Sequence, residues 1–261
     1  MDIRGTKGAL VVAAWNHFAL TQRFLESLAK AGAQNWRVFL IDNGSSDETP
    51  KSVVALATRL GIDLVYLRNA DNQGCARAWN RGLRQAIAEA YALIGVVNND
   101  LVFSSRWDKG LRNFWRQHGT QFVISPHVLR GTLSQFDENA EAFARRNQKR
   151  IRKQLVSAAM FMDAGVFAKI GFFDERFFVG FEDYDFMIRL QAAGIGFRTL
   201  GNSVVWHKEK SSRSALSADH ETEGQRLFLE KWGPSAMGHA VVGIPRMKKR
   251  YWRLRERFGL L

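Results

Sequence analysis

Three carboxylates lie close together in the segment 180–190, where Glu182, Asp183 and Asp185 alternate with Phe and Tyr. A carboxylate removed from water by aromatic neighbours has a raised pKa, which suits a general base working near neutral pH. A helix start is the alternative explanation, because anionic groups there gain about 0.3–1 kcal/mol from the helix dipole. A second acid, Asp100, follows another apolar run upstream. Two acidic loops after buried strands favour one active site.

The elements that must position these acids alternate regularly in the first hundred residues. Apolar runs and capping signals predict strands at 9–15, 36–41, 63–67 and 92–97 and helices at 21–30, 49–60 and 75–89. Such alternation implies an α/β fold with a parallel sheet covered by helices on both faces. Ligands in these sheets bind beyond the carboxyl ends of the strands, where the polar turn 42–47 and Asp100 fall. We therefore expect an enzyme or a ligand-binding protein.

The pattern is less regular in the second half of the chain. A helix is expected at 107–118 and strands at 122–125 and 197–206. The segment 130–153 is polar and charged without clear periodicity, so it is predicted to be a mobile loop or a surface helix. The segment 155–163 is apolar with small residues. From Lys208 onward the chain is polar, then basic and aromatic.

Length and composition limit the class of protein. A chain of 261 residues with 46% hydrophobic content can bury one large core. Its uncharged apolar stretches fall short of the roughly 20 residues needed to cross a bilayer, and no signal peptide is expected at its start. The single Cys75 excludes an internal disulfide and fits a reducing compartment. We expect a cytoplasmic protein.

The formal charge of +13 predicts a polyanionic partner or surface. Much of the excess lies in the segments 145–153 and 246–257. The end of the chain, 251–261, mixes cations with Trp, Phe and Leu, which suits peripheral attachment to an anionic membrane. The alternative is a helix that packs on the core or on a second subunit of a homodimer. No nucleic acid is expected as a partner, because three carboxylates in a phosphate-binding groove would repel it without a metal.

Short motifs along the chain together resemble the inverting glycosyltransferases of family 2 with the GT-A fold, especially their rhamnosyltransferase-like branch. They lie at 11–16, 40–47, 72–82, 97–100, 173–175, 182–185 and His207. The resemblance implies a GT-A domain at 1–210, with a nucleotide-binding part at about 8–103 and an acceptor-binding part at about 104–210. A basic, aromatic helical extension would follow at 211–261.

The resemblance also implies where a nucleotide would bind. Asp42 would accept the ring N–H of a uracil or thymine, which a carboxylate can do and a Lys cannot. A turn acid that caps Gly44 and Ser45 is the alternative. The segment 72–82 resembles a glycine-containing loop at a helix start, where backbone N–H groups meet phosphate; helix capping by Asn72 is its plainer explanation. The implied donor-binding residues are Asn16, Asp42, Asn43, Gly74, Asn80, Asn98 and Asn99.

A divalent ion is implied as cofactor. Asn98, Asn99 and Asp100 take the place of the family's Asp-x-Asp motif, so that only Asp100 keeps a carboxylate for Mg²⁺ or Mn²⁺. Oxygens of the donor diphosphate and water would complete the shell. His207 matches the position of a second ligand, and an imidazole suits Mn²⁺ better than Mg²⁺. A buried structural histidine is the alternative for His207.

Asp183 matches the family's general base, which takes the proton of the acceptor hydroxyl as that oxygen attacks the anomeric carbon opposite the leaving nucleotide. Attack from that face inverts the configuration. Glu182 and Asp185 would support it, one by binding the acceptor and the other by capping the helix. Asp174, Glu182 and Trp206 form the expected acceptor site, although core packing is the commoner fate of such aromatic residues.

The expected reaction moves a sugar from a dTDP- or UDP-sugar, with dTDP-L-rhamnose preferred, to a cell-surface glycan or a polyprenyl-diphosphate-linked acceptor. A nucleotidyltransferase is one alternative, but the segment 15–20 lacks the glycine-rich, basic loop of that class. A catalytically inactive scaffold of the same fold and a nucleic-acid-binding protein are the others.

Overall fold

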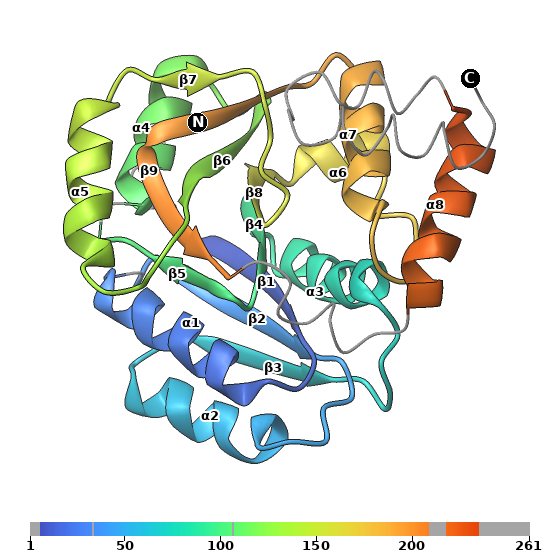
Figure 1. The fold of residues 1–261 in the computed structure, drawn as a ribbon, viewed down its shortest axis with the longest axis horizontal. Coiled ribbons are helices and arrows are strands. Elements are labelled where there is room, and N and C mark those ends of the chain that lie inside the picture. Colours follow the sequence, from blue (N-terminus) through green and yellow to red (C-terminus); the bar gives the residue numbers. More distant parts are fainter. Residues whose placement is uncertain (1–5, 33, 106, 209–217, 235–261) are drawn as a thin grey trace.

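The computed structural model describes residues 6–32, 34–105, 107–208 and 218–234. One sheet of nine strands runs through them, in the order β3-β2-β1-β4-β8-β6-β9-β5, with β7 added beside β9 (Figure 1). The strands are β1 Gly8–Ala14, β2 Trp36–Asp42, β3 Leu64–Arg68, β4 Leu93–Asn98, β5 Leu101–Phe103, β6 Phe122–Leu129, β7 Ile151–Arg152, β8 Ala159–Asp163 and β9 Gly196–His207. The helices are α1 Phe18–Lys30, α2 Thr49–Arg59, α3 Cys75–Ala88, α4 Trp107–His118, α5 Phe136–Arg146, α6 Gly165–Ile170, α7 Glu182–Ala192 and α8 Ala218–Trp232.

The first half of the sheet is parallel, as expected, and its strands β1, β2 and β4 are buried on both faces, whereas the edge strand β3 is half-buried. Leu10 and Val12 of β1 lie in one core cluster with residues of α1, α2 and α4. Ala9 and Val11 lie in a second cluster with residues of α3, α6 and α7. Because successive side chains of a strand point to opposite faces, a strand covered on both sides is apolar throughout. The expected strands and helices up to residue 98 are confirmed, with ends that differ by up to three residues.

The second half of the sheet contains the antiparallel pairs, so that the expected GT-A-like sheet is parallel only in part. β8 pairs antiparallel with β4 and with β6, β9 is parallel to β6, and β5 is antiparallel to β9. The sheet is therefore mixed. An apolar run shows that a strand is buried but not which way it runs, since direction is set by the backbone partner it finds. Strands from both expected parts of the domain thus belong to the same sheet, and the division near residue 103 stays a prediction.

The charged segment 130–153 contains one helix and a short strand. In α5, the buried residues Phe136, Ala140 and Ala144 recur every four positions and pack on Val204 and Trp206 of β9. This spacing puts them on one face of the helix. The expectation of a surface helix is confirmed for α5.

The last described helix, α8, packs on the loop before α7. Phe228 of α8 is fully buried with Phe177 and Phe181. Gly224 of α8 lies so close to that loop that a Cβ would stand 2.8 Å from the carbonyl oxygen of Gly180. A helix is thus present at 218–232, whereas the basic tail at 246–261 lies outside the described residues and the expected extension at 211–261 stays a prediction. Over the described ranges, the structure holds no helix that is both long and apolar enough to span a membrane.

Candidate active site

Asp100 and His207 meet where β4, β5 and β9 come together. β5 and β9 pair antiparallel with Leu101 opposite His207, which places Asp100 beside the imidazole. The Oδ1 atom of Asp100 lies 3.0 Å from Nε2 of His207. The carbonyl of Asp100 also accepts a hydrogen bond from the backbone N–H of Lys208. The two side chains expected to hold a metal are therefore adjacent.

The chemistry of this pair fits a divalent ion. A carboxylate oxygen and an imidazole nitrogen are ligands that Mn²⁺ accepts, and Mg²⁺ takes the carboxylate. The side chain of His207 is 21% exposed and that of Asp100 is 8% exposed, so the pair is partly accessible to solvent. In the part of the chain that the structure describes, no three His, Cys, Asp or Glu side chains gather into a larger metal-binding set. An ion held here would need oxygens from substrate or water for the rest of its shell.

The two asparagines before Asp100 differ in position. Asn98 ends β4 and is partly exposed. Asn99 is buried, and its amide donates a 2.9 Å hydrogen bond to Oγ1 of Thr21 in α1. Asn99 therefore fastens the turn to α1, while Asn98 is the better placed of the two for a ligand.

Asp42 closes β2 and is completely buried. Its Oδ1 accepts from the backbone N–H of Ser45, and its Oδ2 accepts from the Tyr66 hydroxyl and from Nη1 of Arg68, each at 2.5 Å. Arg68 also donates to the carbonyl of Ser45. Burial first, then the hydrogen bond to Asp42, raise the pKa of Tyr66. The turn role weighed for Asp42 is present, and a nucleobase would have to share this carboxylate with Tyr66 and Arg68.

Asn43 organises the neighbouring loop. Its amide nitrogen donates to Oδ1 of Asn72 at 2.7 Å and to the carbonyl of Gly74 at 3.2 Å. Its amide oxygen accepts from Asn69 and from the backbone N–H of Gln73. This amide network gives the loop at 69–75 one conformation beside the end of β2.

Asn16 joins the loop after β1 to the turn after β2. Its backbone N–H donates to Oγ of Ser45 and its side-chain oxygen accepts from the backbone N–H of Ser46, both at 2.8 Å. Asn16 has a φ of 53°, in the left-handed region that Asn tolerates better than most residues. Three loops at the carboxyl edge of the parallel strands are therefore linked to one another.

Gly74 is where the loop at 69–75 touches the segment before α7. It has a φ of 84°, and a Cβ there would stand 2.5 Å from the carbonyl oxygen of Phe178. That carbonyl accepts a 2.8 Å hydrogen bond from the backbone N–H of Cys75. Glycine is required here by its backbone conformation and by the approach of Phe178. The expected donor loop and the expected acceptor segment are in direct contact.

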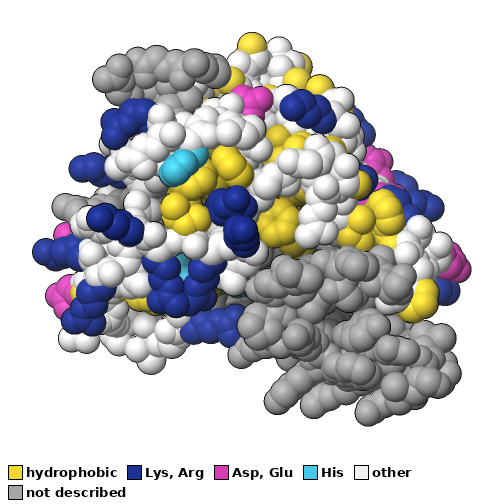
Figure 2. Space-filling model, turned by 90° about the horizontal axis from the view of Figure 1, so that it is seen from above, with side chains coloured by type: hydrophobic (Ala, Val, Ile, Leu, Met, Phe, Trp, Pro, Cys, Tyr) yellow, Lys and Arg dark blue, Asp and Glu magenta, His cyan; other side chains and the backbone are white. Residues whose placement is uncertain are grey.

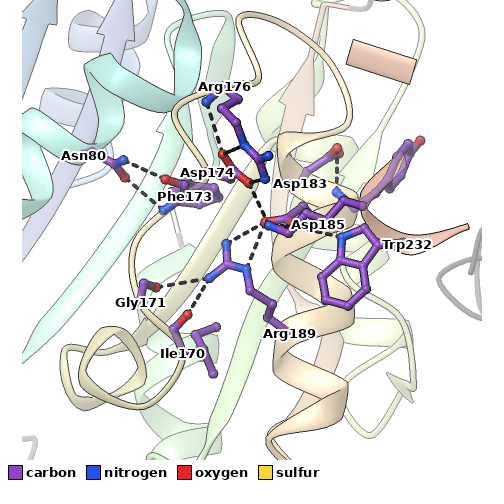
Figure 3. A network of polar contacts seen from close by, with 12 residues as sticks. Asn80, Ile170, Gly171, Phe173, Asp174, Arg176, Asp183, Asp185, Arg189 and Trp232 are labelled. Atoms are coloured by element: carbon purple, nitrogen blue, oxygen red, sulfur yellow. Dashed lines mark hydrogen bonds and ion pairs between the residues drawn. The ribbon is translucent and has the colours of Figure 1, made fainter. Parts of the chain in front are cut away.

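The expectation that Asn80 contacts the donor does not fit the hydrogen bonds of its side chain. Its side chain is fully buried in α3, donates to the carbonyl of Phe173 and to Oε1 of Glu175, and accepts from the backbone N–H of Phe173. Figure 3 shows the two hydrogen bonds between Asn80 and the backbone of Phe173. Since these bonds use both its nitrogen and its oxygen, Asn80 holds the loop at 171–181 on α3 rather than facing a ligand. The same hydrogen bond, and then Arg84, lower the pKa of Glu175.

Asp183 lies in the first turn of α7. Its side chain is 7% exposed and its Oδ1 accepts from the backbone N–H of Tyr184 at 3.0 Å. The residue before the helix, Phe181, has a φ of 70°, which costs of the order of 1–3 kcal/mol for a bulky residue and is typical of functional sites. Phe181 is held by Phe228 of α8, with ring centroids 5.6 Å apart. The start of α7 is thus set by a strained residue that α8 covers.

Asp185 links α7 to α8 instead of capping its own helix. It is fully buried, and its Oδ1 accepts from the indole N–H of Trp232 at 2.9 Å and lies 2.6 Å from Nζ of Lys231. Its Oδ2 lies 2.9 Å from Nε of Arg189. The expectation that Asp185 caps the helix is wrong, because both oxygens are used by side chains (Figure 3).

Asp174 belongs to the same network. Arg176 donates to both of its oxygens, and Lys231 lies 2.7 Å from Oδ2. The hydrogen bond from Arg176, supported by Lys231, holds the pKa of Asp174 well below its usual range. Because Arg176 and Lys231 already bind both oxygens of Asp174, this carboxylate is poorly placed to bind an acceptor. It connects the loop at 171–181 to α8 instead.

The two other expected acceptor residues also differ. Glu182 is buried in the first turn of α7, next to Asp183, and keeps a place beside the candidate base. Trp206 packs among Phe136, Ala140 and Ala144, and its indole N–H donates to the carbonyl of Gly131 at 2.9 Å. Because neighbouring strand residues point to opposite faces, Trp206 faces away from His207. Trp206 therefore packs in the core, which was the alternative to a role in acceptor binding.

Sequence reasoning missed four residues that complete this arrangement. Tyr66 and Arg68 end β3 next to Asp42, and the polar position of Arg68 at the carboxyl edge was a usable signal. Lys231 and Trp232 reach Asp185 from α8. Nothing in the local sequence indicates that these last two residues meet the acidic segment.

Comparisons with known proteins place the chain in a family. The model of "Glycosyl transferase family 2" matches residues 9–175. PGL/p-HBAD biosynthesis glycosyltransferases of Mycobacterium tuberculosis and Mycobacterium bovis are 25% identical over 253 residues, which cover 90% of this chain and 93% of each relative.

Solved structures show the same fold. The chain is similar to TarS of S. aureus in complex with UDP-GlcNAc, with a TM-score of 0.63 at 16% identity, over 91% of this chain and 67% of that one. It is similar to GalNAc-T7 with UDP, GalNAc and Mn²⁺, with a TM-score of 0.65 at 12% identity, over 96% and 54%. For the mannosyltransferase PcManGT of Pyrobaculum calidifontis with GDP-Man and Mn²⁺ the TM-score is 0.60 at 15% identity, over 98% and 81%. At these identities the likeness concerns the fold.

Proposed function

The chain belongs to glycosyl transferase family 2 and has a GT-A fold, and from this premise we propose that it is an inverting, metal-dependent glycosyltransferase. The observation that carries the proposal is the contact between Asp100 and His207 at the end of the sheet where the loops of Asp42, Asn43 and Gly74 also gather. Ligands of open α/β sheets bind at this edge. The Mn²⁺ and sugar nucleotides in structures of the same fold support a donor and an ion here.

Asp100 and His207 would hold the ion, which when bound offsets the negative charge that develops on the leaving diphosphate. Asn98 is partly exposed beside them and is proposed to contact the donor. Asn16 and Asn43 act by fixing the loops around the donor, since their amides are already engaged with Ser45, Ser46 and Asn72. An ordered loop loses less entropy when a ligand binds.

Asp183 is proposed to be the general base. Its carboxylate takes the proton of an acceptor hydroxyl while that oxygen forms a bond to the anomeric carbon of the donor sugar. The bond from this carbon to the diphosphate breaks on the opposite side, so that the configuration inverts and a nucleoside diphosphate leaves. The position of Asp183 in the first turn of α7, next to buried Glu182, supports a carboxylate shielded from bulk water.

The donor is proposed to be a dTDP- or UDP-sugar, with dTDP-L-rhamnose first. A carboxylate at Asp42 suits the ring N–H of thymine or uracil. Tyr66 and Arg68 already bind this carboxylate, so we propose that they turn toward the nucleotide when it arrives. UDP-GlcNAc in TarS and GDP-Man in PcManGT are ligands of those proteins and leave the sugar of this chain open.

The acceptor is proposed to be a cell-surface glycan or a polyprenyl-diphosphate-linked intermediate. The names of the mycobacterial relatives refer to PGL/p-HBAD biosynthesis and are in keeping with an acceptor of the cell envelope. We further propose that the protein is cytoplasmic and attaches to the inner face of the membrane through its basic tail. The alternative is that the tail packs on a second subunit in a homodimer.

The test is thermal stabilisation of the full chain by dTDP, UDP, GDP and CMP, each with and without Mn²⁺. Stabilisation by dTDP or UDP that depends on Mn²⁺ is expected. Stabilisation by GDP or CMP alone would overturn the role of Asp42. No response to any nucleotide would leave the fold in place and refute the transferase, making an inactive scaffold the better account.

A further inference from the structure

A strongly basic surface lies where α5 ends and β7 begins. It consists of the exposed side chains of Arg145, Arg146, Lys149, Arg150 and Lys153, and we refer to it as the α5–β7 surface. No Asp or Glu occurs between residues 142 and 162. Figure 2, which looks onto the end of the molecule that carries β7, shows Lys and Arg side chains gathered on one side of this face. This part of the chain therefore presents a concentrated positive charge.

The acids of α5 do not neutralise this charge. Asp137, Glu138 and Glu141 lie in the first half of the helix, where they favour its positive end. Glu141 lies 3.2 Å from Arg145, and the side chain of Arg145 nevertheless remains 63% exposed. The positive potential is also felt by His127, which stacks on Phe143. Burial first, then Arg152 and Arg150, lower its pKa to about 4, so it stays uncharged at neutral pH.

An aliphatic side chain stands among these cations. Ile151 is 45% exposed, and among the described residues only Val54 is another large hydrophobic side chain as open. Exposed cations around an apolar side chain match the boundary between anionic headgroups and acyl chains, where Lys and Arg are attracted to the headgroups. A surface for single-stranded nucleic acid would instead present aromatic side chains for bases to stack on, and Ile151 cannot serve that role.

We propose that the α5–β7 surface docks on an anionic phospholipid membrane, with Lys149, Arg150 and Lys153 on the headgroups and Ile151 at the interface. The surface belongs to the folded domain and is separate from the basic tail at 246–261. Its use for a lipid-linked acceptor rests on the proposed function, whereas the binding itself requires neither donor nor metal.

Co-sedimentation of the full chain with vesicles tests this surface. One set of vesicles is pure phosphatidylcholine and the other contains equal parts of phosphatidylcholine and phosphatidylglycerol. The wild type should bind the mixed vesicles, less so at high salt, and leave the neutral ones unbound. The double variant Lys149→Glu/Lys153→Glu should bind at least about tenfold more weakly, and Ile151→Asp should also bind more weakly.

Matched controls lie on α2, where Lys51, Val54 and Arg59 are also exposed. Lys51→Glu/Arg59→Glu and Val54→Asp change the same charge and the same kind of side chain, and both should bind as the wild type does. Thermal unfolding of every variant shows that it is folded. Because no nucleotide is present, vesicle binding and the nucleotide-dependent stabilisation of the proposed transferase can each fail without the other.

Three results would overturn the proposal. Wild-type binding that both α5–β7 variants retain would assign it to another part of the chain, such as the tail. Equal loss in the α2 controls would show that only total charge matters. Tighter binding to a single-stranded oligonucleotide than to the mixed vesicles, lost in Lys149→Glu/Lys153→Glu, would make the surface a nucleic-acid site.

Discussion

Oδ1 of Asp100 and Nε2 of His207 lie 3.0 Å apart because two strands distant in the chain pair in one register. β5 contributes only three residues, and its first, Leu101, stands opposite His207. A shift of one residue would turn the His207 side chain to the other face of the sheet. The metal pair of the proposed enzyme is therefore a product of sheet pairing.

Removing either member of this pair should abolish the effect of Mn²⁺ on nucleotide binding. Asp100→Asn and His207→Ala are each expected to weaken the binding of dTDP or UDP in the presence of Mn²⁺ by about tenfold or more, since a ligand of the ion is lost. Binding without Mn²⁺ should change little. Calorimetric titration measures both. His118→Ala, on α4, is the control, and undiminished Mn²⁺ dependence in the site variants would refute the assignment.

Gly74→Ala should disturb the contact between the donor loop and the segment before α7. The added Cβ would stand 2.5 Å from the Phe178 carbonyl oxygen, on a residue with a φ of 84°. Gly61→Ala is a matched control, because Gly61 has a φ of 66° and open space around it. We expect Gly61→Ala to cost about 1 kcal/mol of unfolding free energy and Gly74→Ala about 2–3 kcal/mol.

Only Gly74→Ala should also raise the donor KM. Denaturant unfolding and steady-state kinetics on both variants check this. Equal effects in the two variants would mean that the contact with Phe178 has no role beyond backbone conformation.

Trp232→Phe should slow transfer although Trp232 lies on α8. The change removes the indole N–H that Asp185 accepts, and Asp185 lies two residues from the proposed base Asp183. Loss of one hydrogen bond to a buried carboxylate should lower the unfolding free energy by about 1–2 kcal/mol. Turnover should fall by roughly tenfold through misplacement of α7, with the Kd for donor unchanged.

Trp115→Phe is the control, since it removes the indole N–H that donates to the Phe122 carbonyl elsewhere in the domain. It should reduce stability without reducing turnover. If both variants lose turnover in proportion to stability, α8 acts on folding alone.

The ion pairs of Asp174 should make the unfolding free energy of the protein fall in acid. Arg176 first, then Lys231, hold its pKa below the usual 3.8, so the unfolded chain binds its proton more readily than the folded protein does. A lowered pKa stabilises the fold fully above the unfolded value, and this stabilisation disappears as the pH falls through the folded value. The wild type should therefore lose more unfolding free energy between about pH 5 and pH 2 than Asp174→Asn does. Identical acid profiles would contradict this pairing.

The first half of the fold was predictable from the sequence because its strands β1, β2 and β4 are buried on both faces. Residues 9–12 are all apolar, yet Leu10 and Val11 lie in different clusters, and helices with one apolar stripe separate the strands. The mixed half was less predictable. The three residues of β5 are too few to show a period, and the direction of β8 depends on β4 and β6.

The site was predictable at the level of motifs and less so at the level of side chains. Asp100, His207 and Asp183 were proposed from motif positions, and the structure puts the first two in contact. Motif position does not show which way a side chain points, so Asn80, Asp174 and Trp206 were assigned to ligands although they bind other parts of the protein. The hydrogen bond between Asp185 and Trp232 joins α7 and α8, and the local sequence of neither helix predicts this contact.

The role of Asp183 is tested most directly by the turnover of Asp183→Asn with dTDP-L-rhamnose and UDP-sugars in the presence of Mn²⁺. Turnover is measured as release of the nucleoside diphosphate, and the Kd for the same donor is measured separately. Glu138→Gln, which replaces an exposed carboxylate of α5 by an amide, serves as the control. Asp183→Asn should bind donor as the wild type does and turn over about 10²–10⁴-fold more slowly, because no base remains to take the acceptor proton. Wild-type turnover in Asp183→Asn would contradict the assignment of the base and, with it, the proposed mechanism.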